Sequence, residues 1–236
     1  MAIAGRPPVH IPTFERGRTL GDFLVPARLR DRLGSGAWDL VLVVLGAVLI
    51  ALTANVSLPV PGSPVPVTGQ TFSVLLVGGT LGLRRGLSSA VLYLLMGLFL
   101  PVYAGHRSGL SVFGSIDPTG VHLGATGGYL LGFILASAVA GRLAEQGWDR
   151  HPGTALGAMA IGNVLIYALG LPWLALAANL GLQETLAKGL LPFLVGDALK
   201  LMAGAAILPL GWWTVRRRPS ERPGRPEAGG AKGSAG

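Results

Sequence analysis

The chain has 236 residues, of which half are apolar and only 13% are charged, and its mean hydropathy is +0.57. This composition is typical of integral membrane proteins and excludes an ordinary soluble domain. The net charge is +8. Because cysteine is absent, disulfides and thiolate metal sites are excluded as well.

Six segments are apolar over about the 20 residues that a helix needs to cross the hydrocarbon layer of a membrane. They are residues 38–58, 66–83, 86–104, 124–144, 154–180 and 189–215. We therefore predict an all-α, polytopic membrane protein with six transmembrane helices. The last two segments contain Pro172, Pro192 and Pro209, which predicts kinks or breaks in them.

Both ends of the chain differ in composition from the apolar part. Residues 1–37 contain six arginines and four prolines without an uninterrupted apolar run, unlike a cleaved signal peptide. Residues 216–236 are rich in Pro, Gly, Arg and Glu, which predicts a disordered basic tail. We expect a cytoplasmic extension over 1–37, a six-helix membrane domain over 38–215 and a disordered tail over 216–236.

The basic residues are distributed unevenly between the predicted loops. Sixteen of the nineteen Lys and Arg fall on the side of the two termini, whereas only Arg107 and Lys188 fall on the opposite side. The positive-inside rule therefore places both termini in the cytoplasm, with the protein in the cell membrane. The basic tails are expected to contact anionic lipid headgroups rather than nucleic acid.

Asp197 and Lys200 are the only titratable residues inside the predicted spans' apolar cores. Their spacing of three residues places both side chains on one face of a helix. Ionisable groups are costly inside a membrane, and a buried ion pair seldom stabilises a protein by itself. We therefore interpret this pair as a ligand site, about eight residues or roughly 12 Å below the outer end of the span, rather than as a packing device.

Three polar or aromatic residues in the fifth span could complete such a site. Asn163 and Tyr167 are four residues apart and share a helix face. An interhelical hydrogen bond is an equally good interpretation of this pair. Trp173 could stack on a ligand or anchor the helix at the membrane interface.

Two further groups lie near the outer surface. Gly127, Gly128 and Tyr129 open the fourth span, where adjacent glycines permit close approach of a ligand or of another helix. Gln70, Thr71 and Phe72 begin the second span, beneath a proline-rich turn at 58–66 that could act as a lid.

Ala47 and Ala51 form a strip of small residues on the first span. From the residues alone, helix packing within the monomer is the favoured interpretation.

The motifs for several other chemistries are missing from the sequence. The four histidines show no metal-ligand spacing, and neither a phosphate-binding loop nor a serine-protease motif occurs in the spans. We therefore expect no catalytic residues, no metal, no cofactor and no ATP hydrolysis by this chain.

Five motifs together resemble the BioY family, the biotin-specific substrate-binding subunits of energy-coupling-factor (ECF) transporters. They are the run Thr68–Gly78 after the proline-rich turn and the runs 93–105, 126–133, 162–175 and 192–200. A single one of these motifs would be weak, but five in the family's order on a six-helix profile are specific.

The resemblance implies a transporter subunit, not an enzyme, that binds biotin from outside in a pocket near its outer face. It also implies a transmembrane coupling protein and two cytoplasmic ATPases as partners, with Ala47 and Ala51 at the interface with the coupling protein. On this basis Asp197, Asn163 and Tyr167 would bind the ureido ring, and Lys200 either the ureido oxygen or the carboxylate. The expected biotin contacts also include Gln70, Phe72, Gly127, Gly128, Tyr129 and Trp173.

Two other functions remain open at this point. The same fold hosts subunits for other vitamins, because a fold does not fix its ligand. A lipid-modifying membrane enzyme is a weaker alternative, since no catalytic dyad or metal set can be assembled from the sequence.

Overall fold

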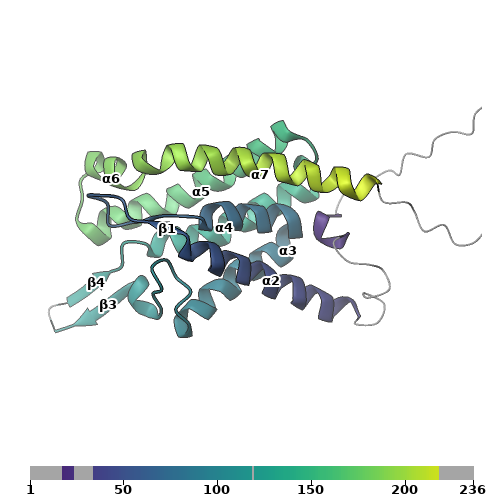
Figure 1. The fold of residues 1–236 in the computed structure, drawn as a ribbon. Coiled ribbons are helices and arrows are strands. Elements are labelled where there is room, and N and C mark those ends of the chain that lie inside the picture. Colours follow the sequence, from purple (N-terminus) through teal and green to yellow (C-terminus); the bar gives the residue numbers. More distant parts are fainter. Residues whose placement is uncertain (1–17, 24–33, 119, 218–236) are drawn as a thin grey trace, which may run out of the picture.

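A computed structural model describes residues 18–23, 34–118 and 120–217 (Figure 1). Its α-helices are α2 (Ser35–Asn55), α3 (Gln70–Phe99), α4 (Gly127–Glu145), α5 (Pro152–Ala178), α6 (Leu182–Gly189) and α7 (Leu191–Arg217). Three short 3-10 helices lie before or between them: η1 (Leu20–Asp22), η2 (Leu110–Val112) and η3 (Trp148–Arg150). The predicted helical class is therefore confirmed for the described residues, apart from two small β-hairpins.

Four of the helices, α2, α4, α5 and α7, are long and apolar enough to cross a membrane. They correspond to the predicted first, fourth, fifth and sixth spans. The predicted second and third spans both fall within α3, which contains a residue with non-helical geometry, Gly82 (φ 84°, ψ −178°).

The chain reverses direction at Gly82. A Cβ added to Gly86 would lie 2.9 Å from the Cα of Gly78, whereas eight residues of straight helix would separate these positions by about 12 Å. A positive φ favours glycine because a Cβ there is strained. α3 is therefore a helical hairpin with arms at 70–81 and 83–99.

The prolines do not interrupt the helices in which they lie. α5 continues through Pro172 and α7 continues through Pro209. Pro192 occupies the first turn of α7, where its missing N–H costs no hydrogen bond. The expected breaks therefore do not occur at these residues, and the break in this region lies just before α7, where α6 ends at Gly189.

The two β-hairpins lie in connections at the same end of the helices as α6 (Figure 1). The first pairs β1 (Ser57–Leu58) with β2 (Val67–Thr68), around the proline-rich turn. The second pairs β3 (Gly114–Asp117) with β4 (Gly120–Leu123), within the long loop between α3 and α4.

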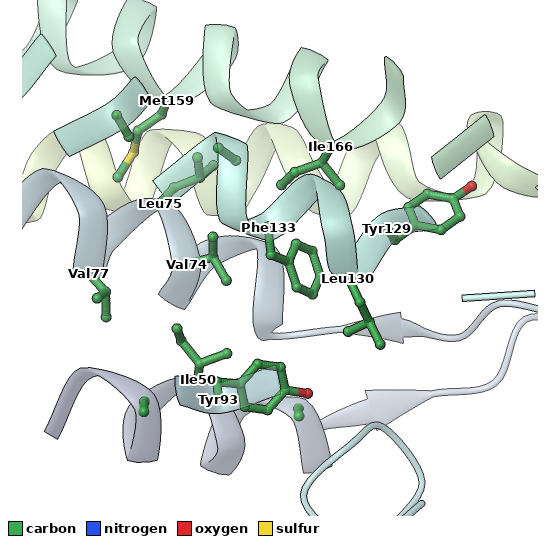
Figure 2. Close-up of a cluster of buried hydrophobic side chains, with 14 of the residues drawn as sticks. Ile50, Val74, Leu75, Val77, Tyr93, Tyr129, Leu130, Phe133, Met159 and Ile166 are labelled. Carbon is green, nitrogen blue, oxygen red and sulfur yellow. The ribbon is translucent and has the colours of Figure 1, made fainter. Parts of the chain in front are cut away.

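Small residues bring the central helices into close contact. A Cβ at Gly78 would lie 2.4 Å from the carbonyl oxygen of Ser137, and one at Gly141 would lie 2.5 Å from the carbonyl carbon of Gly82. Such contacts are the main source of helix association in membranes, where burial of apolar surface contributes little. Figure 2 shows larger side chains filling the remaining space from α2, α3, α4 and α5: Ile50, Val74, Leu75, Val77, Tyr93, Tyr129, Leu130, Phe133, Met159 and Ile166.

The opposite end of the helices is held by an ion-pair cluster and by part of the predicted N-terminal extension. Arg85 pairs with Asp22 of η1 and with Asp39 of α2, at 2.7 Å in both cases. Leu20 is 5% exposed and packs at Gly211 of α7. Residues 1–17, 24–33 and 218–236, and with them most of the predicted extension and tail, lie outside the described residues.

Candidate functional site

A pocket lies where α3, α4 and α7 begin, beneath the β1–β2 hairpin. It has a volume of about 580 Å³, part of which is open to solvent. Its lining consists of Val65, Pro66, Thr68, Gln70, Thr71, Tyr103, Ala104, Arg107, Val112, Thr126, Tyr129, Leu130, Phe133, Ile166, Tyr167, Phe193, Asp197 and Lys200. Most of this lining is apolar, as in typical small-molecule sites, with a few polar groups that can fix an orientation.

Asp197 is the most heavily hydrogen-bonded side chain of the pocket and is 3% exposed. Its Oδ2 accepts hydrogen bonds from Asn163 Nδ2 (3.2 Å) and from the Tyr167 hydroxyl. Its Oδ1 accepts from Lys200 Nζ at 3.0 Å and, at the longer distance of 3.5 Å, from the Thr71 hydroxyl. Donors from four residues on three helices, α3, α5 and α7, therefore hold this carboxylate in place.

Lys200 reaches Thr71 as well as Asp197. Its Nζ donates to Thr71 Oγ1 at 3.1 Å, so Lys200, Thr71 and Asp197 form a closed ring of contacts between α3 and α7. The ammonium group has three protons, and these two contacts leave one for a ligand.

Two tyrosines form an aromatic wall beside this ring. Tyr129 and Tyr167 pack edge to face, with ring centroids 6.3 Å apart. The Tyr129 hydroxyl donates to the carbonyl oxygen of Gly189, at the junction of α6 and α7. This contact fixes the start of α7, and hence the position of Asp197.

Gln70 lines the pocket and is bonded on both sides. Its Nε2 donates to the Tyr93 hydroxyl, and its Oε1 accepts from Thr68 Oγ1 at 3.1 Å. The second bond connects the start of α3 to the β1–β2 hairpin.

The structure brings five of the expected site residues, Asp197, Lys200, Tyr167, Tyr129 and Gln70, together around one pocket, and their contact with a ligand stays a prediction. Asn163 lies behind Asp197 and does not line the pocket; its Nδ2 bonds the carboxylate, and its Oδ1 has no hydrogen-bond partner among the described residues. Phe72 borders a smaller cavity on the far side of the Asp197–Lys200 pair.

The remaining three predicted contacts pack against one another outside the pocket lining. A Cβ at Gly128 would lie 2.2 Å from the Cβ of Trp173, and one at Gly127 would lie 2.8 Å from its ring. Trp173 Nε1 donates to the carbonyl oxygen of Gly124 at 2.8 Å. In this structure the two glycines give Trp173 of α5 room to pack. They therefore permit close approach of another helix, which was one of the two interpretations of the glycine pair.

Ala47 and Ala51, the expected partner interface, lie on a face of α2 that is buried within the monomer. Ala47 is fully buried and Ala51 is 6% exposed. Both belong to the side of α2 that is buried against the hairpin of α3, where Gly46 faces Val77 and Ser89. In this structure the strip packs helix against helix within the monomer, which is the interpretation that the residues alone favour.

Thr68, Arg107 and Thr126 line the pocket but were not among the site residues expected from the sequence, whereas Thr71 was named there beside Gln70 and Phe72. Arg107 is the only Lys or Arg in the long loop between α3 and α4, and its isolation on the sparsely basic outer side was the available signal. Thr68 and Thr126 gave none, because a threonine near a helix start is ordinarily a capping residue.

Within the described part of the chain, no three His, Asp or Glu side chains come together in a way that could hold a metal ion. The pocket geometry is that of a binding site: one anchored ion pair, an aromatic wall and an opening at one end.

The profile of the BioY family matches residues 29–217, which include every residue of this pocket. The chain belongs to the BioY family. The expectation drawn from the five motifs is thereby confirmed. The short helix η1, at residues 20–22, lies before the region that the BioY profile matches.

Proteins named as biotin transporters are among the relatives. The Biotin transporter BioY of Rhizobium etli is 34% identical over 178 residues, which cover 72% of this chain and 90% of that protein. The Biotin transporter BioY of Thermotoga maritima is 36% identical over 160 residues, which cover 67% and 86%. These relatives are named as transporters and not as enzymes.

A solved structure has the same fold. The crystal structure of the S-component for biotin from an ECF-type ABC transporter matches with a TM-score of 0.62 at 22% identity. The match covers 79% of this chain and 93% of that one. Together with the four apolar helices, these relatives identify the chain as a membrane protein of the BioY family.

Proposed function

We propose that this chain is the substrate-specific subunit of an ECF-type transporter and takes up biotin with high affinity across the cytoplasmic membrane. The observation that carries this proposal is the buried Asp197–Lys200 pair on the wall of the pocket. The names of its BioY relatives support biotin as the ligand.

The proposed topology has six membrane spans, with the two arms of α3 as the second and third. The distribution of charge supports cytoplasmic termini, because Arg84, Arg85, Arg142 and Arg150 all lie at the end opposite the pocket. In this arrangement residues 38–215 form the membrane domain, 1–37 and 216–236 are cytoplasmic, and the pocket faces outward.

Biotin offers a ureido ring with two N–H donors and one carbonyl, an apolar fused ring system and a carboxylate tail. The ureido ring would bind at the base of the pocket. One of its N–H groups would replace the 3.5 Å contact from Thr71 to Asp197, which is the longest of the four. The free proton of Lys200 would then bind the ureido oxygen, while the fused rings pack on Tyr129 and Tyr167.

Arg107 is the proposed partner of the carboxylate. It lies in the loop after α3, whereas Asp197 and Lys200 lie on α7, so the pocket carries charged groups on two separate walls. Its guanidinium fits the planar carboxylate group. This leaves Lys200 for the ureido oxygen, and so distinguishes between the two roles that the sequence left open.

Transport would require partners, because the sequence contains no phosphate-binding loop. We propose a transmembrane coupling protein and two cytoplasmic ATPases, as the S-component title of the structural neighbour suggests.

The proposal is tested by calorimetric titration of biotin into the purified protein and into Asp197→Asn and Lys200→Ala. Each substitution leaves the other partner buried without its counter-charge, so we expect affinity to fall by at least about 100-fold. Lys188→Ala is the matched control, because Lys188 lies outside the pocket in a surface pair with Glu184. Wild-type affinity in both pocket variants would refute the site, and competition by another vitamin instead of biotin would refute the ligand.

A further inference from the structure

The contact between α3 and α7 begins at the pocket and runs toward the opposite end of the helices. At the pocket, Lys200 Nζ donates to Thr71 Oγ1 at 3.1 Å. Farther along, a Cβ at Gly79 would lie 2.9 Å from the side chain of Leu208. The first arm of α3 ends at Gly82, where the chain reverses direction, so the last turns of α7 extend beyond this arm.

The short helix η1 lies beside this end of α3 and α7 (Figure 1, purple). Leu20 is buried, and a Cβ at Gly211 of α7 would lie 3.0 Å from its Cδ1 atom. On the α3 side, a Cβ at Gly21 would lie 3.0 Å from the side chain of Leu81. η1 therefore joins α3 to α7 at the end opposite the pocket, as Lys200 joins them at the pocket.

An aromatic pair extends this junction along α7. Phe23, which directly follows η1, packs edge to face on Trp212, with ring centroids 5.6 Å apart. Trp212 is 1% exposed. Two successive residues of α7, Gly211 and Trp212, are thus covered by apolar side chains from the segment 20–23.

The charged contact of η1 allows this segment to detach. Arg85 pairs with Asp22 of η1 and also with Asp39 of α2. If η1 moves away, Arg85 keeps the Asp39 carboxylate, so detachment leaves no buried charge without a partner. All three side chains are partly exposed, and ion pairs in such places contribute little to stability. The apolar contacts of Leu20 and Phe23 are therefore the main source of the docking energy.

α7 connects this junction to the pocket. It is one continuous helix of 27 residues, along which Lys200 and Gly211 are about 16 Å apart. A change in the tilt of α7 at one end therefore moves the residues at the other end relative to α3. The pocket depends on this relative position, because the contacts among Lys200, Asp197 and Thr71 join the two helices.

We propose that Leu20 is a positioning residue, which packs between α3 and Gly211 and so holds α7 at the angle that places Lys200 and Asp197 for biotin. This inference rests on the proposed function, because it takes biotin as the ligand of the pocket. Docking of η1 and binding of biotin then favour the same position of α7, so each strengthens the other.

The first test is calorimetric titration of biotin into the full-length chain and its variants. Leu20→Ala removes the contact with Gly211, so we expect its dissociation constant to rise about tenfold. Leu20→Met keeps a side chain of similar volume and should bind as wild type does. Leu210→Ala is the matched control and should also bind as wild type does, because Leu210 is the neighbour of Gly211 on α7 but is 58% exposed.

The stoichiometry of the same titrations separates positioning from a loss of folded protein. Unfolded molecules lower the number of sites that are measured, but they leave the affinity of the remaining molecules unchanged. Leu20→Ala should therefore bind more weakly at the wild-type stoichiometry. Unchanged affinity in Leu20→Ala, with or without a lower thermal midpoint, would make Leu20 a purely structural residue and overturn the inference.

The second test measures the same coupling from the other end of α7. Leu20→Cys introduces a single thiol into a chain without cysteine. The position is buried, so a maleimide reacts there only when η1 detaches. Saturating biotin should slow this reaction about tenfold, because the coupling between two sites is reciprocal. Gln146→Cys is the control, since Gln146 is exposed and should react at one rate with and without biotin.

Equal reaction rates of Leu20→Cys with and without biotin, in a protein that binds biotin, would overturn the inference and leave the proposed function intact. If wild type itself does not bind biotin, the proposed function and this inference both fail.

Discussion

Asp197 and Asp149 are both buried carboxylates, and their surroundings differ. Asp197 is bonded through both of its oxygens. Asp149 lies in η3, outside the long helices, and is 1% exposed. Its Oδ2 accepts from Trp212 Nε1, whereas its Oδ1 has no hydrogen-bond partner within the described ranges. Burial therefore raises the pKa of Asp149 from 3.8 to about 6, against the opposing effect of the Trp212 bond.

This raised pKa predicts a pH dependence of stability. Between about pH 4 and 6 the folded protein holds a proton on Asp149 that the unfolded chain releases, so the free energy of unfolding falls as pH rises through this window. A pKa difference of this size corresponds to about 3 kcal/mol in the free energy of unfolding. Above about pH 6 Asp149 is ionised in both states, so its contribution no longer changes with pH.

The measurement compares thermal unfolding of wild type and Asp149→Asn at pH 4, 5, 6 and 7. The asparagine keeps an acceptor for Trp212 but does not titrate, so the wild-type midpoint should fall relative to the variant from pH 4 to 6. Parallel curves over this range would contradict the prediction.

At the scale of elements, the hairpin of α3 depends on glycines at its crossing points. The two arms meet at Gly78 and Gly86, and Ser137 of α4 lies against both. A side chain at these crossings must push backbone atoms apart, because a Cβ at Gly86 would lie 2.9 Å from the Gly78 Cα.

Gly86→Ala should therefore lower the thermal midpoint, by an overpacking cost of about 1–3 kcal/mol. Gly153→Ala is the matched control, since Gly153 is also helical and an added Cβ there meets nothing within 4 Å. The control should unfold at the wild-type temperature or slightly above it, because alanine favours helix over glycine. A Gly86→Ala midpoint equal to that of the control would mean that the arms do not pack in this way.

The same hairpin shows where element prediction from the sequence reaches its limit. Apolar runs predicted two helices at 66–83 and 86–104, which correspond in outline to the arms of α3. The positive φ of Gly82 and the contact of Gly78 with Gly86 could not be predicted, because they depend on how α4 and η1 pack around the turn.

At the scale of the whole molecule, the pocket and the ion-pair cluster of Arg85 lie at opposite ends of the helices. In the proposed orientation the first end is outside the cell and the second is inside it. The absence of cysteine from the natural sequence makes this orientation directly measurable.

Single cysteines introduced at exposed positions of the two ends should differ in their reactivity with a membrane-impermeant maleimide. Ser108→Cys, in the loop after α3, should react in intact cells. Gln146→Cys, in the turn after α4, should react only after the membrane is permeabilised. Labelling of Gln146→Cys in intact cells would reverse the proposed topology.

The sequence by itself determined the features that depend on local composition and spacing. Long apolar runs predicted the helices that can span a membrane, because their length must match the hydrocarbon layer. The spacing of Asp197 and Lys200 predicted that both lie on one side of a helix, since a rise of three residues is nearly one turn. Five motifs in order predicted the family.

Only the tertiary structure decided which distant residues meet. Thr71, Arg107 and Thr126 reach the pocket from three different parts of the chain, and Trp173, not a ligand, covers Gly127 and Gly128. Ala47 and Ala51 are buried within the monomer for the same reason. Local spacing fixes the face of a helix on which a residue lies, but the partner of that face depends on packing between segments far apart in the sequence.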